Sequence, residues 1–154
     1  MLDIRPYVPA DCDPTIEIFQ RAIRQTASKD YNPAQVAAWS TVNDREAWGQ
    51  RRLSRPTWIA EHDGKPVGFS DLEPDGHLDM MFVHPDHQGI GVASLLAAKV
   101  EAEARALGLQ RIFVEASITA RPFFERRGYT LLGPITVEDR GQSFLIFGME
   151  KLLP

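Results

Sequence analysis

The spacing of apolar residues in the first third of the chain predicts a strand followed by helices. Apolar and polar residues alternate from residue 2 to residue 8, and a period of two is typical of a strand. A helical spacing comes next, carried by the apolar residues Ile16, Phe19 and Ile23. Asp11 or Asp13 can cap this helix at its amino end. Residues 33–52 favour one or two shorter helices that begin at a proline, which suits the first turn of a helix.

From residue 57 onward the period changes to two, and the pattern predicts three strands joined by tight turns. Asp63-Gly64 and Asp75-Gly76 are typical of such turns, and the strands that they separate are residues 57–62, 67–73 and 77–83. The later elements are a helix from residue 92 that Gly108 ends, a strand over 111–116, a short helix over 118–127 and two strands around Gly141.

Two glycines stand between the last of these three strands and the long helix. Gly89 and Gly91 have no Cβ, so a ligand can approach the backbone closely and several N–H groups can converge on it. A helix that starts here leaves its first N–H groups unpaired and directs the positive end of its dipole to the same point. The segment therefore predicts an anion site suited to a phosphate or pyrophosphate. No P-loop lysine follows, and Ser94 replaces the third glycine of a dinucleotide-binding fingerprint.

Composition narrows the class of protein. The 154 residues suit a single domain over 1–154, and no apolar stretch approaches the ~18 residues of a membrane span. We recognise no secretory leader after Met1. A net charge of −4 without a basic stripe argues against nucleic acid as the partner. The one cysteine, Cys12, suits a reducing compartment, so a cytoplasmic protein is expected.

Gln88, Gly91 and Ala93 form the pattern Gln/Arg-x-x-Gly-x-Gly/Ala, which resembles the pyrophosphate loop of the GNAT superfamily of acyl-CoA-dependent N-acyltransferases. The segments 67–69 and 120–129 also resemble parts of this family. The resemblance implies an α+β fold with a mixed, mostly antiparallel sheet of six to seven strands, flanked by about four helices. It also implies an N-acetyltransferase that moves acetyl directly from acetyl-CoA to a primary amine of a small molecule or peptide. No metal and no membrane are expected to take part. Dimers are common in similar proteins, so a homodimer is one of the oligomeric states left open.

The same resemblance assigns the residues that would hold coenzyme A. The backbone after the predicted strand would bind the pyrophosphate, and the end of the strand would pair with the amides of the pantetheine arm. The residues implied are Met81, Phe82, Val83, Gln88, Gly89, Ile90, Gly91, Val92, Ala93, Ser94 and Phe124.

Attack of an amine on a thioester needs a base more than an acid. A lysine-like amine has a pKa of ~10.4 and must lose a proton at pH 7, whereas a thiol of pKa ~8.5 departs as thiolate with little help. In the strand predicted before the glycine loop, His77 and Asp79 share one face, and in similar enzymes these positions lie beside the acceptor amine. Asp79 is the first choice as base because it is deeper in the strand, with His77 second. Glu73 and Glu115 are weaker candidates.

The position of the general acid differs from that in similar enzymes. Phe124 stands where similar enzymes place a tyrosine, and it has no proton to donate. Ser117 stands where asparagine is common and is a candidate to hold a water. Two hypotheses stay open at this point: an acetyltransferase that works without a general acid, and an acyl-CoA-binding module with little or no activity. Tyr31, Trp39 and Trp48 either line the acceptor pocket or pack in the core.

Overall fold

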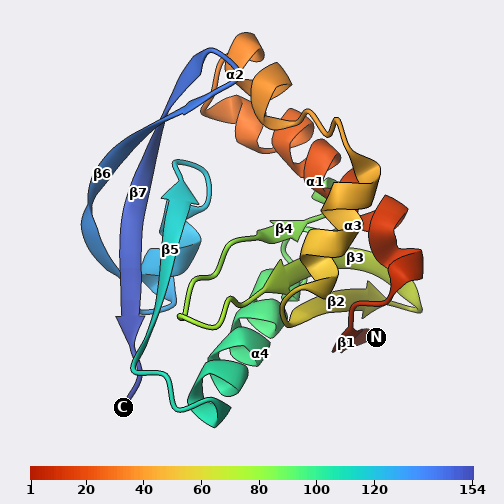
Figure 1. Cartoon of the computed structure of the whole chain (residues 1–154), viewed down its shortest axis with the longest axis vertical. Helices are drawn as coiled ribbons and strands as arrows, with labels where there is room; N and C mark the ends of the chain where they lie inside the picture. Colours follow the sequence, from red (N-terminus) through yellow and green to blue (C-terminus); the bar gives the residue numbers. More distant parts are fainter.

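Seven strands form two antiparallel sheets in the computed structural model, which describes residues 1–154 (Figure 1). The first sheet has the order β1-β2-β3-β4, with β1 at Leu2–Pro6, β2 at Thr57–His62, β3 at Lys65–Asp71 and β4 at Met81–Val83. The second has the order β5-β7-β6, with β5 at Arg111–Ser117, β6 at Thr130–Asp139 and β7 at Gln142–Leu152.

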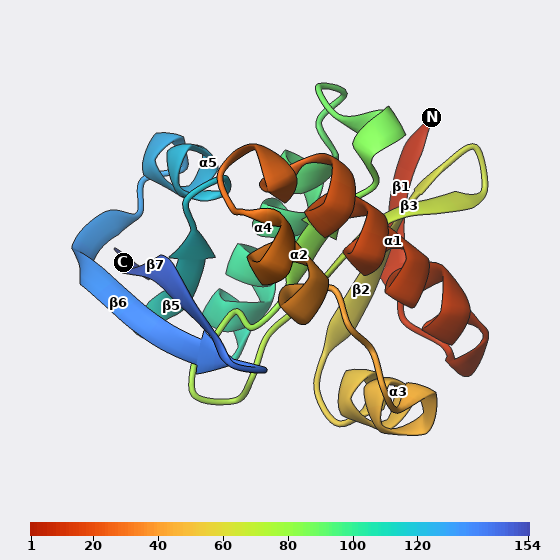
Figure 2. The same ribbon diagram turned by 90° about the horizontal axis from the view of Figure 1, so that it is seen from above.

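Five α-helices surround these sheets: α1 Cys12–Gln25, α2 Pro33–Trp39, α3 Arg45–Leu53, α4 Val92–Ala106 and α5 Arg121–Arg126. Short 3-10 turns occupy Pro9–Asp11, Ala27–Lys29 and Pro85–His87. The second sheet lies to one side of the molecule, across from α1 and α3 (Figure 2). No helix combines the length and apolar character of a membrane span.

The first sheet buries both of its faces. Alternation along β2 directs Ile59 to the cluster that α1 completes with Ile18 and Phe19, whereas Ala60 packs under α4 with Val92 and other residues. Helix α4 contacts β2, β3 and β4, and α1 contacts β3 and β4. The glycine loop at the start of α4 is therefore held against the end of β4.

The single mixed sheet expected from the sequence is in fact two sheets. Strands β4 and β5 do not pair; the connection between the sheets is one isolated parallel bridge, between His77 and Phe113. The two sheets separate beyond this bridge, and side chains from both line the space between them.

The strand predicted over residues 77–83 is wrong for residues 77–80. The buried carboxylate of Asp71 accepts hydrogen bonds from the backbone N–H groups of Asp79 and Met80, at 3.0 and 2.8 Å. The N–H of Leu78 donates to the carbonyl of Phe113 on the second sheet, at 2.9 Å. These bonds draw the chain across from one sheet to the other, so β4 begins only at Met81.

The other predicted elements are present, but β3 spans 65–71 instead of 67–73 and α5 spans 121–126 instead of 118–127. The expected cap of the first helix is wrong: Asp11 stands at its start but makes no side-chain cap bond, because its carboxylate binds Arg5 and the Val8 N–H. The strand over 57–62 has the expected bounds, and the long helix begins at Val92. Gly108 follows its end with φ +74°, the left-handed conformation that favours glycine after a helix. The last two strands form a hairpin around Gly141.

Candidate active site

A cavity of about 880 Å³ opens between the two sheets. Its walls come from α1, from α3 and the segment that joins it to α2, from residues 78–83, from β5 and α5, and from the β6–β7 hairpin. Most of its lining is apolar, with a few charged side chains, as is usual for a binding site for small molecules.

The glycine loop supplies one end of this cavity. Gly89 and Gly91 have φ of +77° and +94°, and the three amides from Gly89 to Gly91 donate no hydrogen bond to the rest of the protein. Helix α4 follows without a side-chain cap, so its first N–H groups and its dipole are directed into the loop. The loop thus has the geometry of an anion site.

The residues expected to bind coenzyme A take different places around this end. Five of them, Met81, Phe82, Val83, Gln88 and Ala93, line the cavity together with Phe124. Gly89, Ile90, Gly91 and Ser94 are exposed beside it and are not part of its lining. Val92 is buried and packs against the first sheet.

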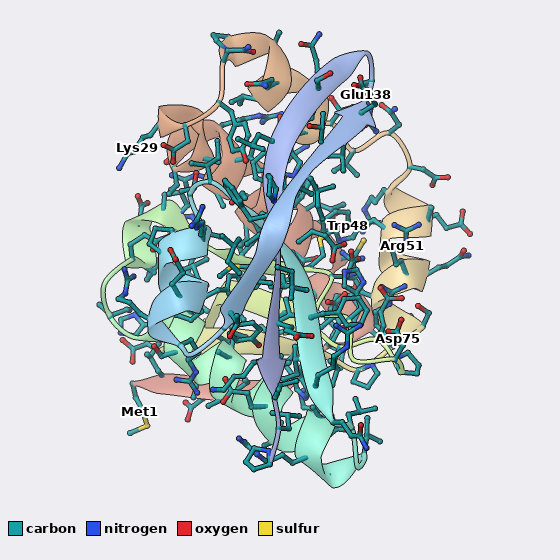
Figure 3. The ribbon with its side chains drawn as sticks, turned by 90° about the vertical axis from the view of Figure 1, so that its left-hand side faces the viewer. Met1, Lys29, Trp48, Arg51, Asp75 and Glu138 are labelled. Carbon is teal, nitrogen blue, oxygen red and sulfur yellow. The ribbon has the colours of Figure 1, made fainter.

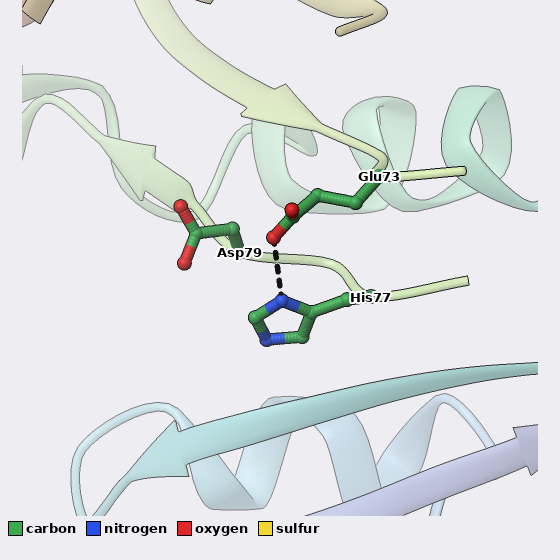
Figure 4. A group of neighbouring side chains, drawn as sticks. All are labelled: Glu73, His77 and Asp79. Carbon is green, nitrogen blue, oxygen red and sulfur yellow. Dashed lines mark hydrogen bonds and ion pairs between the residues drawn. The ribbon is translucent and has the colours of Figure 1, made fainter. Parts of the chain in front are cut away.

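Four carboxylates line the cavity: Asp44, Asp79, Glu115 and Asp139. Asp79 comes from the segment between the sheets, and Glu115 comes from β5. His77 lies behind them, with Nδ1 2.7 Å from Glu73 Oε1 and Nε2 3.0 Å from Glu115 Oε1 (Figure 4). Burial alone would lower the pKa of His77, but the hydrogen bond to Glu73 and the charges of Glu115 and Asp79 outweigh it and raise that pKa. His77 therefore contacts the cavity through Glu115 and does not line it.

Arg55 connects the carboxylates on the other side. Its Nη1 atom lies 3.3 Å from Glu73, 3.4 Å from Asp79 and 3.7 Å from Asp71. Burial raises the pKa of Asp71 to about 6, although its bond to the Met80 amide opposes this. Arg55 and Asp71 hold the side chain and the backbone of Asp79. We found no sequence signal for this role, because these residues lie 24 and 8 positions from Asp79.

Glu73, His77 and Asp79 offer donor atoms that lie within 4.8 Å of one another, as metal ligands do. However, the guanidinium of Arg55 touches both carboxylates and Glu115 engages the second nitrogen of His77. A cation at this point would have to displace Arg55, so the cluster fits an ion-pair network.

Phe124 and its neighbours form the side of the cavity where similar enzymes place an acid. This ring is 2% exposed and packs edge-on against Tyr129, with the ring centroids 5.0 Å apart. The Tyr129 hydroxyl is buried, has no hydrogen-bond partner and does not line the cavity. Ser117 does line it, while its hydroxyl accepts a bond from the Ala120 N–H at 3.0 Å, just before α5.

Tyr31, Trp39 and Trp48 all line the cavity, and each also packs. The Tyr31 hydroxyl donates to the Leu145 carbonyl at 2.8 Å and accepts from the Ile118 N–H at 2.9 Å, so it joins the helical side to the second sheet. Trp48 projects from α3 (Figure 3) and donates through Nε1 to the Thr15 hydroxyl. These aromatics therefore both pack in the core and line the cavity, and their contact with an acceptor stays a prediction.

Comparison with known proteins identifies the family. The profile of the acetyltransferase (GNAT) domain matches residues 27–153. YafP, an uncharacterized N-acetyltransferase of Escherichia coli K12, is 39% identical over 150 residues, which cover 96% of this chain and 94% of that protein. The chain belongs to the GNAT acetyltransferase family, and it is an acetyl-CoA-dependent N-acetyltransferase.

Solved structures agree. A GCN5-related N-acetyltransferase from Rhodopseudomonas palustris, also described as an aminotransferase of class II, is 37% identical with a TM-score of 0.95, covering 98% of this chain and 95% of that one. YncA of Salmonella typhimurium, solved with acetyl-CoA, has a TM-score of 0.74 at 22% identity and covers 99% and 94%. The expected GNAT fold is confirmed, and the enzyme is favoured over the binding module.

Proposed function

We propose that this chain, acting as one domain, transfers acetyl from acetyl-CoA directly to a primary amine of a small molecule or peptide. The observation that carries the proposal is the cavity itself. It runs from the glycine-loop side, at Gln88 and Ala93, to the carboxylates of Asp79 and Glu115. A thioester and an amine can therefore meet in one space without a covalent carrier. Cys12 is buried, outside the cavity, and near the Arg45 carbonyl at 3.5 Å, which supports direct transfer.

The donor half rests on two features of the backbone. The free amides from Gly89 to Gly91 would receive the pyrophosphate. Strand β4 is the edge of its sheet and pairs on one side only, with β3. Its other edge offers the donors and acceptors that the amides of a pantetheine arm need.

Asp79 is the base in this proposal. It lines the cavity, and Arg55 and Asp71 hold it in place. Asp79 takes one proton from the incoming ammonium, and the amine nitrogen attacks the thioester carbon. As the C–S bond breaks, the second proton of that nitrogen passes to Glu115, which also lines the cavity. The thiol leaves as thiolate, since its pKa of ~8.5 makes that departure easier than deprotonation of the amine at ~10.4. The chain Glu115–His77–Glu73 can receive protons next to Asp79.

The test replaces Asp79 by Asn, which keeps the shape and removes the charge. Release of the coenzyme A thiol is followed with a mixed panel of amines across pH. We expect kcat to fall by about 10²–10⁴, the usual contribution of a general base, with an unchanged affinity for coenzyme A. The loss should shrink at high pH, where more of the amine is already neutral.

His77→Gln is the matched variant, because it leaves Asp79 in place. A loss that stays constant across pH in Asp79→Asn would make Asp79 structural. If His77→Gln instead gave the pH-dependent loss, the base would be His77.

A further inference from the structure

Arg52 is a buried cation on the cavity wall without a partner for its charge. It lies in the last turn of α3, is 1% exposed and lines the cavity. Its Nε and Nη1 atoms are buried and have no hydrogen-bond acceptor, and no carboxylate forms an ion pair with it. The neighbouring Arg55, by contrast, contacts three carboxylates.

The surroundings reduce the cost of this buried charge but do not satisfy its N–H groups. The guanidinium carbon lies 4.6 Å from the centre of the Trp48 ring, which gives a cation–π interaction. The end of α3 also favours a positive charge. Burial lowers the pKa of Arg52, and the nearby charges of Asp71 and Asp79 oppose that shift. None of these supplies the acceptor that a buried donor needs.

The charges near Arg52 indicate which kind of ligand would supply the missing hydrogen-bond acceptor. Arg52 and Asp79 line the same cavity with opposite charges, and Arg51, also on the lining, forms no ion pair. A molecule with an ammonium group near a carboxylate complements this pair, with the amine at Asp79 and the anion at Arg52. A guanidinium presents parallel donors that suit a carboxylate, and the aromatic walls suit an apolar side chain.

We propose that Arg52 binds a carboxylate of the acceptor, so that the substrate of this enzyme is an amine carrying a carboxylate close to its nitrogen, as an α-amino acid does. This inference rests on the function proposed above. It makes Arg52 a specificity-determining residue.

The test compares each amine with and without its carboxylate. Thiol release from acetyl-CoA is measured with L-methionine and L-phenylalanine and with the carboxamide of each. The wild type should favour the acids in kcat/KM by tenfold or more. Arg52→Met should lower that preference at least tenfold, mainly through KM, without lowering Tm, because no protein hydrogen bond is lost. Arg105→Met, which removes an exposed arginine of α4, should keep the preference.

A second measurement needs no variant. With coenzyme A present, N-acetyl-L-methionine should raise the Tm of the wild type, whereas its carboxamide should not. Equal acetylation of acids and carboxamides, or an equal shift of Tm by the two products, would overturn the assignment of Arg52 and leave the proposed function intact. Absence of thiol release with every amine would refute the proposed function, and the product measurement would then still decide about Arg52.

Discussion

Gly68 of β3 lies directly against Val92 and Leu96 of α4, and replacing it by Ala tests how the glycine loop is held. A Cβ at this position would lie 2.7 Å from Cγ1 of Val92, 3.1 Å from the Phe82 carbonyl and 3.2 Å from Cδ1 of Leu96. Ordinary contacts begin at 3.4 Å, so the closest pair is short by 3.4 − 2.7 = 0.7 Å. Val92 is stiff because it is β-branched, and it is 2% exposed, so it cannot rotate away.

The physical cost follows from overpacking. An extra methyl in a tight core costs about 1–3 kcal/mol, and the lower entropy of the unfolded chain offsets about 0.4–1 kcal/mol of it. We expect a net loss of about 1–2 kcal/mol, which lowers Tm by about 2–8 °C for a chain of this length. Because Val92 is the first residue of α4, the start of the helix must move, and the affinity for coenzyme A should fall with it.

A double-mutant cycle isolates this contact. Val92→Ala removes the atom that Cβ would meet, so the pair Gly68→Ala and Val92→Ala should cost less than the sum of the single changes by about 1–2 kcal/mol. Thermal unfolding gives the stabilities, and titration calorimetry gives the affinity for coenzyme A. An unchanged Tm in Gly68→Ala, or strict additivity in the cycle, would refute this account of the packing.

Three further changes probe the site. Gly91→Val puts a β-branched residue at φ +94° and should weaken coenzyme A binding more than tenfold in a folded protein. An equal affinity by calorimetry would mean that the loop does not bind coenzyme A. Phe124→Tyr should raise turnover by less than about tenfold, because removal of the amine proton carries the larger cost; a hundredfold gain in thiol release would contradict that. The raised pKa of Asp71, about 6 against an ordinary 3.8, means that the folded state binds a proton more tightly than the unfolded state. The contribution of Asp71 to the free energy of unfolding therefore falls by about 3 kcal/mol as the pH rises from about 4 to 6. In Asp71→Asn, the free energy of unfolding measured by denaturant titration should depend less on pH over this range. An unaltered pH dependence would mean that Asp71 is not the group that titrates.

Much of the fold can be predicted from the sequence because its signals are local. The helix from Val92 to Ala106 follows from apolar spacing, and its boundaries follow from glycines at positions 91 and 108 whose left-handed φ angles the structure shows. The anion loop likewise needs only a strand, two glycines and a helix in succession. These features arise from interactions over a few residues, so a single sequence contains them.

Prediction from the sequence fails at residues 77–80. Alternation of His77, Asp79 and Met81 is a valid strand pattern, yet β4 begins only at Met81. A buried carboxylate eight positions away, on Asp71, captures the two amides that a strand would have paired. A pattern of apolar and polar residues does not reveal which side chain will compete for a backbone bond.

What the sequence alone determined is the order of elements, the place of the glycine loop and the family that both resemble. Only the tertiary structure brought Asp79, which Arg55 holds, and Glu115 to one cavity and left Arg52 on its wall without an acceptor. The order of elements depends on short-range spacing and turn chemistry. The charged residues of the site come from three separate segments of the chain, which come together in the space between the two sheets. Their distances and their burial exist only once the chain is folded.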